Sequence, residues 1–193
     1  RKGDDQSYVN LGLCYLNGHG VFKDTTKARE YFEKVYLRNA QAAYHLALLK
    51  HRGDGCVQDK ELAVEMMEGA SEKLCDARHQ YAMWLLDGDG VEKDEAKAME
   101  LLRQCALQAK SPFAYYDLAK CYIDGKGVGV DYTRAIAYLY EAIGQGHPHA
   151  KKELERALAL QKVEMRKEAA SMHNATSIDD LFDDIDSAEW GSD

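Results

Sequence analysis

A short glycine motif recurs four times in this chain and limits the folds available to it more than any other feature. The motif is Gly-x-Gly, and it begins at Gly18, Gly53, Gly88 and Gly125, with spacings of 35, 35 and 37 residues. Self-similarity at a period of about 20 to 50 residues is typical of repeat proteins, in which each repeat is one supersecondary unit. The sequence therefore predicts a tandem array.

Four further positions keep a fixed distance from each motif. A small residue lies six positions before the first glycine, where two helices can approach closely. An aspartate lies six positions after it, where a carboxylate can cap a helix N-terminus. An alanine follows at ten positions and a large apolar residue at thirteen. These four sets are Gly12, Ala47, Ala82 and Ala119; Asp24, Asp59, Asp94 and Asp131; Ala28, Ala63, Ala98 and Ala135; and Tyr31, Met66, Leu101 and Tyr138.

The segments on both sides of each motif have the periodicity of amphipathic helices. "YVNLGLCYL" precedes the first motif and "TKAREYFEKV" follows it, with apolar residues at helical spacing. Proline occurs only at Pro112 and Pro148, which also favours helices. Each repeat is thus predicted to be two antiparallel helices joined by a tight turn. The first glycine ends the first helix, where a positive φ is often needed.

The glycine motif also has to be weighed as a phosphate-binding loop. Such a loop follows a strand and carries further matched residues. Here the motif follows a predicted helix, and its middle residue varies among His19, Asp54, Asp89 and Lys126. We therefore expect a structural turn and no cofactor. Nucleic acid is not an expected partner either, because the chain has no basic footprint.

The histidines and cysteines form no pattern typical of catalysis or metal binding. The five cysteines are irregularly spaced and include no Cys-x-x-Cys pair. His147 and His149 lie near no set of metal-ligating residues. We expect no catalytic residue, no metal site and no enzyme activity. Unpaired cysteines indicate a reducing compartment and hence a cytoplasmic protein, and no apolar stretch reaches the roughly 20 residues of a membrane span.

Residues 8–35, "YVNLGLCYLNGHGVFKDTTKAREYFEKV", resemble the Sel1-like repeat, a relative of the tetratricopeptide repeat. The fourth copy resembles it too, and the second is the most diverged, with Lys50 and Cys56 at positions where the family has tyrosine and valine. The resemblance covers about residues 7–156 and implies an all-α, right-handed superhelical solenoid. The matching positions of the first copy are Leu11, Gly12, Tyr15, Gly18, Gly20, Val21, Asp24, Lys27, Ala28 and Tyr31.

The resemblance also implies a domain layout. Residues 1–173 form the solenoid, with repeats at about 7–41, 42–76, 77–113 and 114–146. A charged helix at about 148–172 has no glycine motif after it and is expected to cap the array. An alternative is that the end of this helix projects to bind a partner.

Members of the family mostly act as scaffolds or adaptors, so we expect a partner protein or peptide. By analogy with tetratricopeptide proteins, the first helices line a concave groove, whose variable positions are candidates for partner binding. The alternative is that several of them pack inside the superhelix. The candidate residues are Tyr44, Leu48, His51, Arg52, His79, Met83, Asp87, Tyr116, Lys120 and Asp124.

Residues 174–193 form a second candidate for binding. This tail carries seven acidic residues and no Lys or Arg, so it accounts for −7 of the net charge of −8. Ile178, Leu181, Phe182 and Ile185 form one apolar stripe among the acids. Alone, such a segment is expected to be disordered, and on a partner it could fold with Phe182 and Trp190 as anchors. The alternative is a solubilising tail.

The sequence leaves two alternatives to an adaptor function. The chain begins with Arg1 rather than Met, so we expect a fragment or a processed product, which could be the regulatory module of a larger enzyme. Cysteine-rich relatives are reported to bind β-lactams, which implies a hydrolase or small-molecule binder as an alternative. This chain lacks the regular cysteine pairs of that branch.

Overall fold

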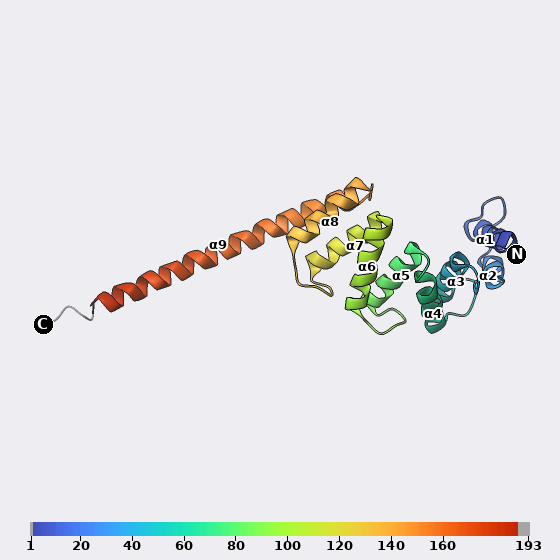
Figure 1. The fold of residues 1–193 in the computed structure, drawn as a ribbon, viewed down its shortest axis with the longest axis horizontal. Helices are drawn as coiled ribbons and strands as arrows, with labels where there is room; N and C mark the ends of the chain where they lie inside the picture. The colour runs from blue at the N-terminus through green and yellow to red at the C-terminus, as the bar shows by residue number, and fades with distance from the viewer. Residues whose placement is uncertain (1, 189–193) are drawn as a thin grey trace.

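Nine helices and no strand occur in the computed structural model of this chain, which describes the backbone of residues 2–188 and the side chains of residues 4–172. Consecutive helices pack against each other, and the array runs from α1 at one end to the long α9 at the other (Figure 1). The all-α fold expected from the sequence is confirmed. The helices are α1 (Lys2–Asn17), α2 (Thr25–Glu33), α3 (Ala40–Arg52), α4 (Lys60–Ser71), α5 (Cys75–Asp87), α6 (Glu95–Ala109), α7 (Pro112–Asp124), α8 (Tyr132–Gly144) and α9 (Ala150–Ala188).

The turn within each hairpin is built in the same way in all four repeats. Its first glycine ends the first helix in the left-handed region, as at Gly88 with φ of 70°. The aspartate that follows caps the second helix: the Asp94 carboxylate accepts a hydrogen bond from the Lys97 N–H at 2.9 Å. Asp24, Asp59 and Asp131 cap their helices with the same geometry. The capping role predicted from the sequence is confirmed.

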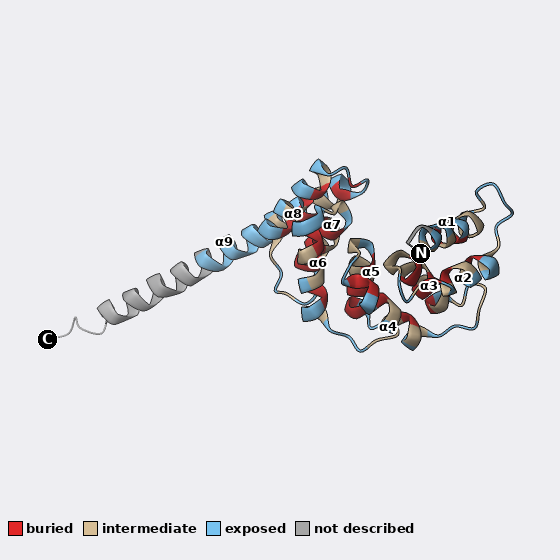
Figure 2. Ribbon diagram, turned by 45° about the vertical axis from the view of Figure 1, so that its right-hand side comes forward, coloured by how far each residue is buried: buried red, intermediate tan, exposed pale blue. Residues whose placement is uncertain are grey.

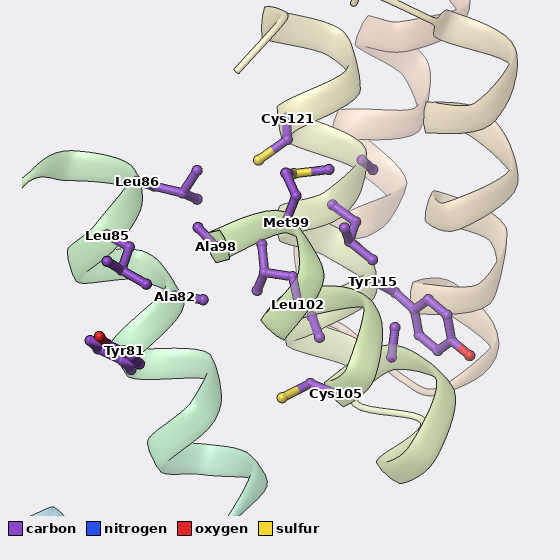
Figure 3. Close-up of a cluster of buried hydrophobic side chains, with 14 of the residues drawn as sticks. Tyr81, Ala82, Leu85, Leu86, Ala98, Met99, Leu102, Cys105, Tyr115 and Cys121 are labelled. Atoms are coloured by element: carbon purple, nitrogen blue, oxygen red, sulfur yellow. The ribbon is translucent and has the colours of Figure 1, made fainter. Parts of the chain in front are cut away.

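The small residues of the repeat lie where the two helices of a hairpin come closest. The alanines at both small positions are fully buried in every repeat that has them. In the third repeat, Ala82 of α5 and Ala98 of α6 face each other across the hairpin (Figure 3). In the first repeat, a Cβ on Gly12 would lie 2.4 Å from the ring of Phe32. The predicted close approach is therefore present.

The second glycine of each motif has a role that the sequence did not reveal. From the second repeat onward, it lies against the start of the second helix of the preceding repeat. A Cβ on Gly55 would lie 2.8 Å from the backbone of Thr25 and Thr26. In the last repeat, the Gly127 N–H donates to the Glu95 carboxylate at 2.8 Å. These glycines therefore set the register between neighbouring repeats.

Buried residues lie on the sides of the helices that face one another within the array (Figure 2). In the described part of the chain, their side chains form two clusters. The larger cluster joins α3 through α9, whereas the smaller one joins α1 and α2 to α3 through residues such as Phe32 and Leu46. Among residues 4–172, whose side chains the structure describes, only Tyr36 and Met66 pack against both clusters, and both are partly buried. The first repeat thus shares its core with one side of α3, and the other side of α3 belongs to the larger cluster.

The start of α9 covers the last hairpin. Ala150 and Ala157 are fully buried, and Leu154 and Leu160 pack against the same core. The Gln161 side chain also donates to the Thr133 hydroxyl at 3.1 Å. The helix then continues to Ala188 and so includes most of the acidic segment 174–193.

Candidate partner-binding face

A small hollow lies between α5 and α7, the first helices of the third and fourth repeats. Its volume is about 50 Å³. Four of the ten body residues proposed from the sequence meet there, two from each helix. The residues that line it are Met83, Leu86, Asp87, Asp117, Lys120, Cys121, Asp124 and Lys126. Partly buried Met83 supplies apolar surface among charged side chains, a combination that suits a protein segment better than a small apolar ligand.

Ion pairs cross from one repeat to the next around this hollow. Lys126 Nζ lies 3.7 Å from the Asp87 carboxylate, and the two side chains are about half exposed. Arg156 of α9 pairs with Asp124 at 3.1 Å. Exposed pairs of this kind contribute about 0–1 kcal/mol each. A partner whose charged side chains replaced these ion pairs would therefore lose little binding free energy by breaking them.

Aromatic and imidazole rings extend the face toward α9. His79 Nε2 and Asp117 Oδ2 are 2.7 Å apart, and both side chains are partly buried. The Tyr116 ring stacks on His147 with a centroid separation of 4.2 Å. Lys120 lies over the same tyrosine, 5.7 Å from its centroid. Burial raises the pKa of the Tyr116 hydroxyl and lowers that of His147, so both are neutral at neutral pH.

The four candidate residues on α3 differ in how far they are buried. Tyr44 and Leu48 are partly buried against the core, and burial raises the pKa of the Tyr44 hydroxyl. Arg52 is exposed. His51 is only 8% exposed and stacks on Trp84 at 4.1 Å, with its Nε2 3.3 Å from the Asp89 carbonyl oxygen. His51 therefore packs within the array, in agreement with the alternative that some of these positions pack inside the superhelix.

The two anchors proposed for the tail cannot be placed on this face. Phe182 and Trp190 lie outside the residues whose side chains the structure describes.

Three residues of the face were missed by sequence reasoning. Asp117, Lys126 and Arg156 each pair across a repeat boundary. The sequence did contain a signal for Asp117. His79 and Tyr116 hold the same position in consecutive repeats, so the repeat register places Asp117, the residue after Tyr116, near His79. Arg156 carried no such signal, because α9 is not part of the repeat pattern.

Two cysteines near the hairpin cores have strongly raised pKa values. Burial and then the nearby Cys75 raise the pKa of the Cys105 thiol to about 12. Burial raises the pKa of Cys121, which lines the hollow, to about 11. Both thiols are therefore protonated at neutral pH, whereas a nucleophilic cysteine needs a thiolate. Across residues 4–172, no three histidine, cysteine or acidic side chains are arranged to hold a metal ion.

Where the structure describes the chain, its helices are too short or too polar to cross a membrane.

Comparison with family models identifies the repeat. The Sel1 repeat model matches residues 5–36, 40–73, 75–109 and 112–147. These ranges correspond to the four hairpins α1–α2, α3–α4, α5–α6 and α7–α8, and the first range begins three residues into α1. A comparison with curated proteins gave no significant match.

Solved structures of similar proteins have the same fold. A Sel1 repeat protein from Oxalobacter formigenes is 26% identical, with a TM-score of 0.72 over 79% of this chain and 61% of that one. The protective antigen c5321 of uropathogenic Escherichia coli strains, which displays an SLR fold, is 27% identical with the same TM-score over 79% of this chain and 33% of that one. This chain thus spans less than two thirds of the length of either relative. The repeat matches and the shared fold place it in the Sel1 repeat family.

Proposed function

We propose that this protein is a non-catalytic scaffold that binds a segment of a partner protein over the hollow between α5 and α7. The observation that carries the proposal is the convergence of Met83, Asp87, Lys120 and Asp124 on one hollow. These positions vary among the repeats, whereas the repeated positions build the hairpins. Sel1 repeat proteins generally mediate protein–protein interaction, so a variable face on this scaffold is a reasonable place for specificity.

The composition of the hollow indicates what such a segment would carry. Met83 offers a flexible apolar contact that adapts to different side chains. Asp87, Lys120, Asp124 and Lys126 surround it with both signs of charge. A segment with one apolar anchor flanked by charged side chains would fit this pattern. The cytoplasmic location expected from the unpaired cysteines is part of the same proposal.

Quantitative affinity capture with matched variants tests the proposal. A double variant, Met83→Glu with Lys120→Glu, changes both the apolar contact and the charge of the hollow. Leu107→Glu is the control, because Leu107 is 77% exposed on α6 and lines no part of the hollow. We expect one or more partners to bind the wild type and the control but not the double variant. Equal capture by all three proteins would refute the proposed face. If only a Phe182→Glu variant lost the partner, the binding site would lie in the tail and not at the hollow.

A further inference from the structure

A second hollow lies between α4 and the connection from α2 to α3, and we call it the α4 hollow. Its volume is about 310 Å³, and its walls come from two consecutive repeats. It shares no lining residue with the hollow between α5 and α7. The apolar and small residues that line the α4 hollow include Tyr36, Leu37, Leu62, Met66, Gly69 and Ala70.

One wall of the α4 hollow exists because α2 is shorter than the other second helices. Each second helix begins directly after its capping aspartate. From there α2 has 9 residues, whereas α4, α6 and α8 have 12, 15 and 13. Residues 34–38 form turns after α2, and among them Tyr36 and Leu37 line the hollow. Leu37 is 83% exposed, so an apolar side chain at the edge of the hollow is accessible to another molecule.

The opposite wall contains a glycine where the other repeats have long polar side chains. Gly69 holds the repeat position of Lys34, Gln104 and Glu141. Glycine inside a helix lowers its stability relative to those residues. A Cβ on Gly69 would meet nothing within 4 Å, so packing in the described part of the chain does not require glycine there. Its effect is to keep the α4 hollow open, because a long side chain at this position would enter it.

Charged side chains of opposite sign lie on either side of Gly69. Glu65 and Lys73 are each about one helical turn away from it, and both line the α4 hollow. Both are exposed, and neither forms an ion pair with another side chain of residues 4–172. Arg38 also lines the hollow, but its guanidinium group already donates two hydrogen bonds to the Asp5 carboxylate. The hollow therefore offers one available acid and one available base.

The dimensions of the α4 hollow suit an extended chain better than a helix. Eight residues of helix rise by about 12 Å, which is the distance along α4 from Glu65 to Lys73. Spread over that length, the volume corresponds to a channel about 5 Å across. A helix is about 10–12 Å wide with its side chains, whereas neighbouring extended chains lie about 5 Å apart. In an extended chain, every second side chain has the same direction, and positions four apart are about 13 Å apart.

The middle of the α4 hollow favours an aromatic side chain. Met66 and Tyr36 line it and are partly buried. A thioether sulfur makes favourable contacts with aromatic rings, and two aromatic rings attract each other in offset or edge-to-face geometry. Gly69 and Ala70 leave room for a flat ring between these two side chains. Aromatic residues are also frequent anchors of protein interfaces.

We propose that the α4 hollow binds an extended segment of a partner protein with the pattern basic-x-aromatic-x-acidic, read in either chain direction. The basic side chain pairs with Glu65, the aromatic ring fills the space over Gly69, and the acidic side chain pairs with Lys73. This site is a second binding surface of the scaffold. It does not depend on binding at the hollow between α5 and α7.

Titration of the full chain with short peptides, followed by protein NMR, tests this pattern. The probe is the acetylated and amidated pentapeptide Lys-Ala-Trp-Ala-Glu, which should bind. Replacing its tryptophan with alanine should lower the association constant at least about tenfold, as expected for an interface anchor. Lys-Ala-Trp-Ala-Lys and Glu-Ala-Trp-Ala-Glu should each bind about two- to fivefold more weakly, because each loses one exposed ion pair.

Variants of the hollow separate loss of the site from loss of folding. Gly69→Leu should lower the association constant of the probe at least about tenfold, and should also raise the thermal midpoint because leucine favours helices. Gln104→Leu, at the same repeat position on α6, is the matched control and should bind the probe as the wild type does. Lys73→Glu makes both ends of the hollow acidic, so it should prefer Lys-Ala-Trp-Ala-Lys to the original probe. Unfolding cannot produce such a reversal.

Several results would overturn the proposal. The wild type could fail to bind the probe at millimolar concentration, Gly69→Leu could bind it with unchanged affinity, or Lys73→Glu could keep the wild-type preference. The Met83→Glu/Lys120→Glu variant should bind the probe normally. If that variant lost the probe, the peptide would bind in the hollow between α5 and α7 and not in the α4 hollow.

Discussion

Gly12 of α1 and Phe32 of α2 are packed so closely that a Cβ on the glycine would lie 2.4 Å from the phenylalanine ring. Phe32 is fully buried and also stacks on His45 of the next repeat at 5.4 Å. One pair of residues thus links the first hairpin internally and connects it to the second.

Gly12→Ala should lower the free energy of unfolding by about 1–3 kcal/mol, because the ring cannot move without disturbing both contacts. Chemical denaturation gives the value. Combining Gly12→Ala with Phe32→Leu should be less destabilising than the sum of the two single changes, since the smaller side chain makes room for the methyl group. Strict additivity would show that the two residues do not compete for space.

The second turn glycines offer a matched pair for the contact between repeats. Gly20 and Gly55 both have a positive φ, of 73° and 71°, but only Gly55 lies against a preceding repeat. Gly20→Ala should cost about 1–2 kcal/mol, the strain of the left-handed conformation. Gly55→Ala should cost at least about 1 kcal/mol more, because the backbone of Thr25 and Thr26 blocks the methyl group. Equal costs in thermal or urea unfolding would contradict the register role.

The helix caps can be tested in the third repeat. Asp94→Ala removes the acceptor for the Lys97 N–H and should destabilise the protein by about 1 kcal/mol. Asp94→Asn keeps an acceptor of similar geometry and should cost much less. Glu92→Ala, in the same exposed turn, is the control and should change stability by less than about 0.5 kcal/mol. If Asp94→Asn were as destabilising as Asp94→Ala, Asp94 would stabilise the helix through its charge and not through the capping hydrogen bond.

The stability of the protein should decrease in mild acid. Burial lowers the pKa of His45 below its ordinary 6.5, so the folded protein holds this imidazole neutral. Below about pH 6.5 the unfolded chain binds a proton that the folded chain excludes, and the free energy of unfolding falls until the lowered pKa is reached. His45→Phe keeps an aromatic ring against Phe32 and should reduce the difference between urea unfolding at about pH 7 and about pH 5. Burial also lowers the pKa of His147, so part of the difference should remain. An unchanged pH dependence in His45→Phe would show that His45 is accessible to protons in the folded state.

The repeated positions allowed the fold to be predicted because each has a local physical cause. Asp94 caps a helix, Gly88 ends one, and Ala82 and Ala98 permit close packing. None of these roles depends on distant parts of the chain. Four copies in register also provided internal confirmation that a single motif could not.

The candidate face could be predicted only in part. The register placed Met83 and Asp87 on one first helix and Lys120 and Asp124 on the next, and the four residues line one hollow. It could not show that His51 would stack on Trp84, because tryptophan occurs only once in that repeat position. The pairing of Asp124 with Arg156 depends on where α9 crosses the array, which no repeat pattern encodes.

The division of the buried side chains into two clusters has a mechanical consequence. A hollow of about 310 Å³ lies where the clusters meet, with Tyr36 and Met66 among its walls. Both clusters use α3, which contributes Leu46 to the smaller one and Ala47 to the larger one, so a change in the width of this space has to be accommodated on both sides of the same helix. Movement of the first hairpin relative to the rest of the solenoid therefore requires α3 to shift against both clusters.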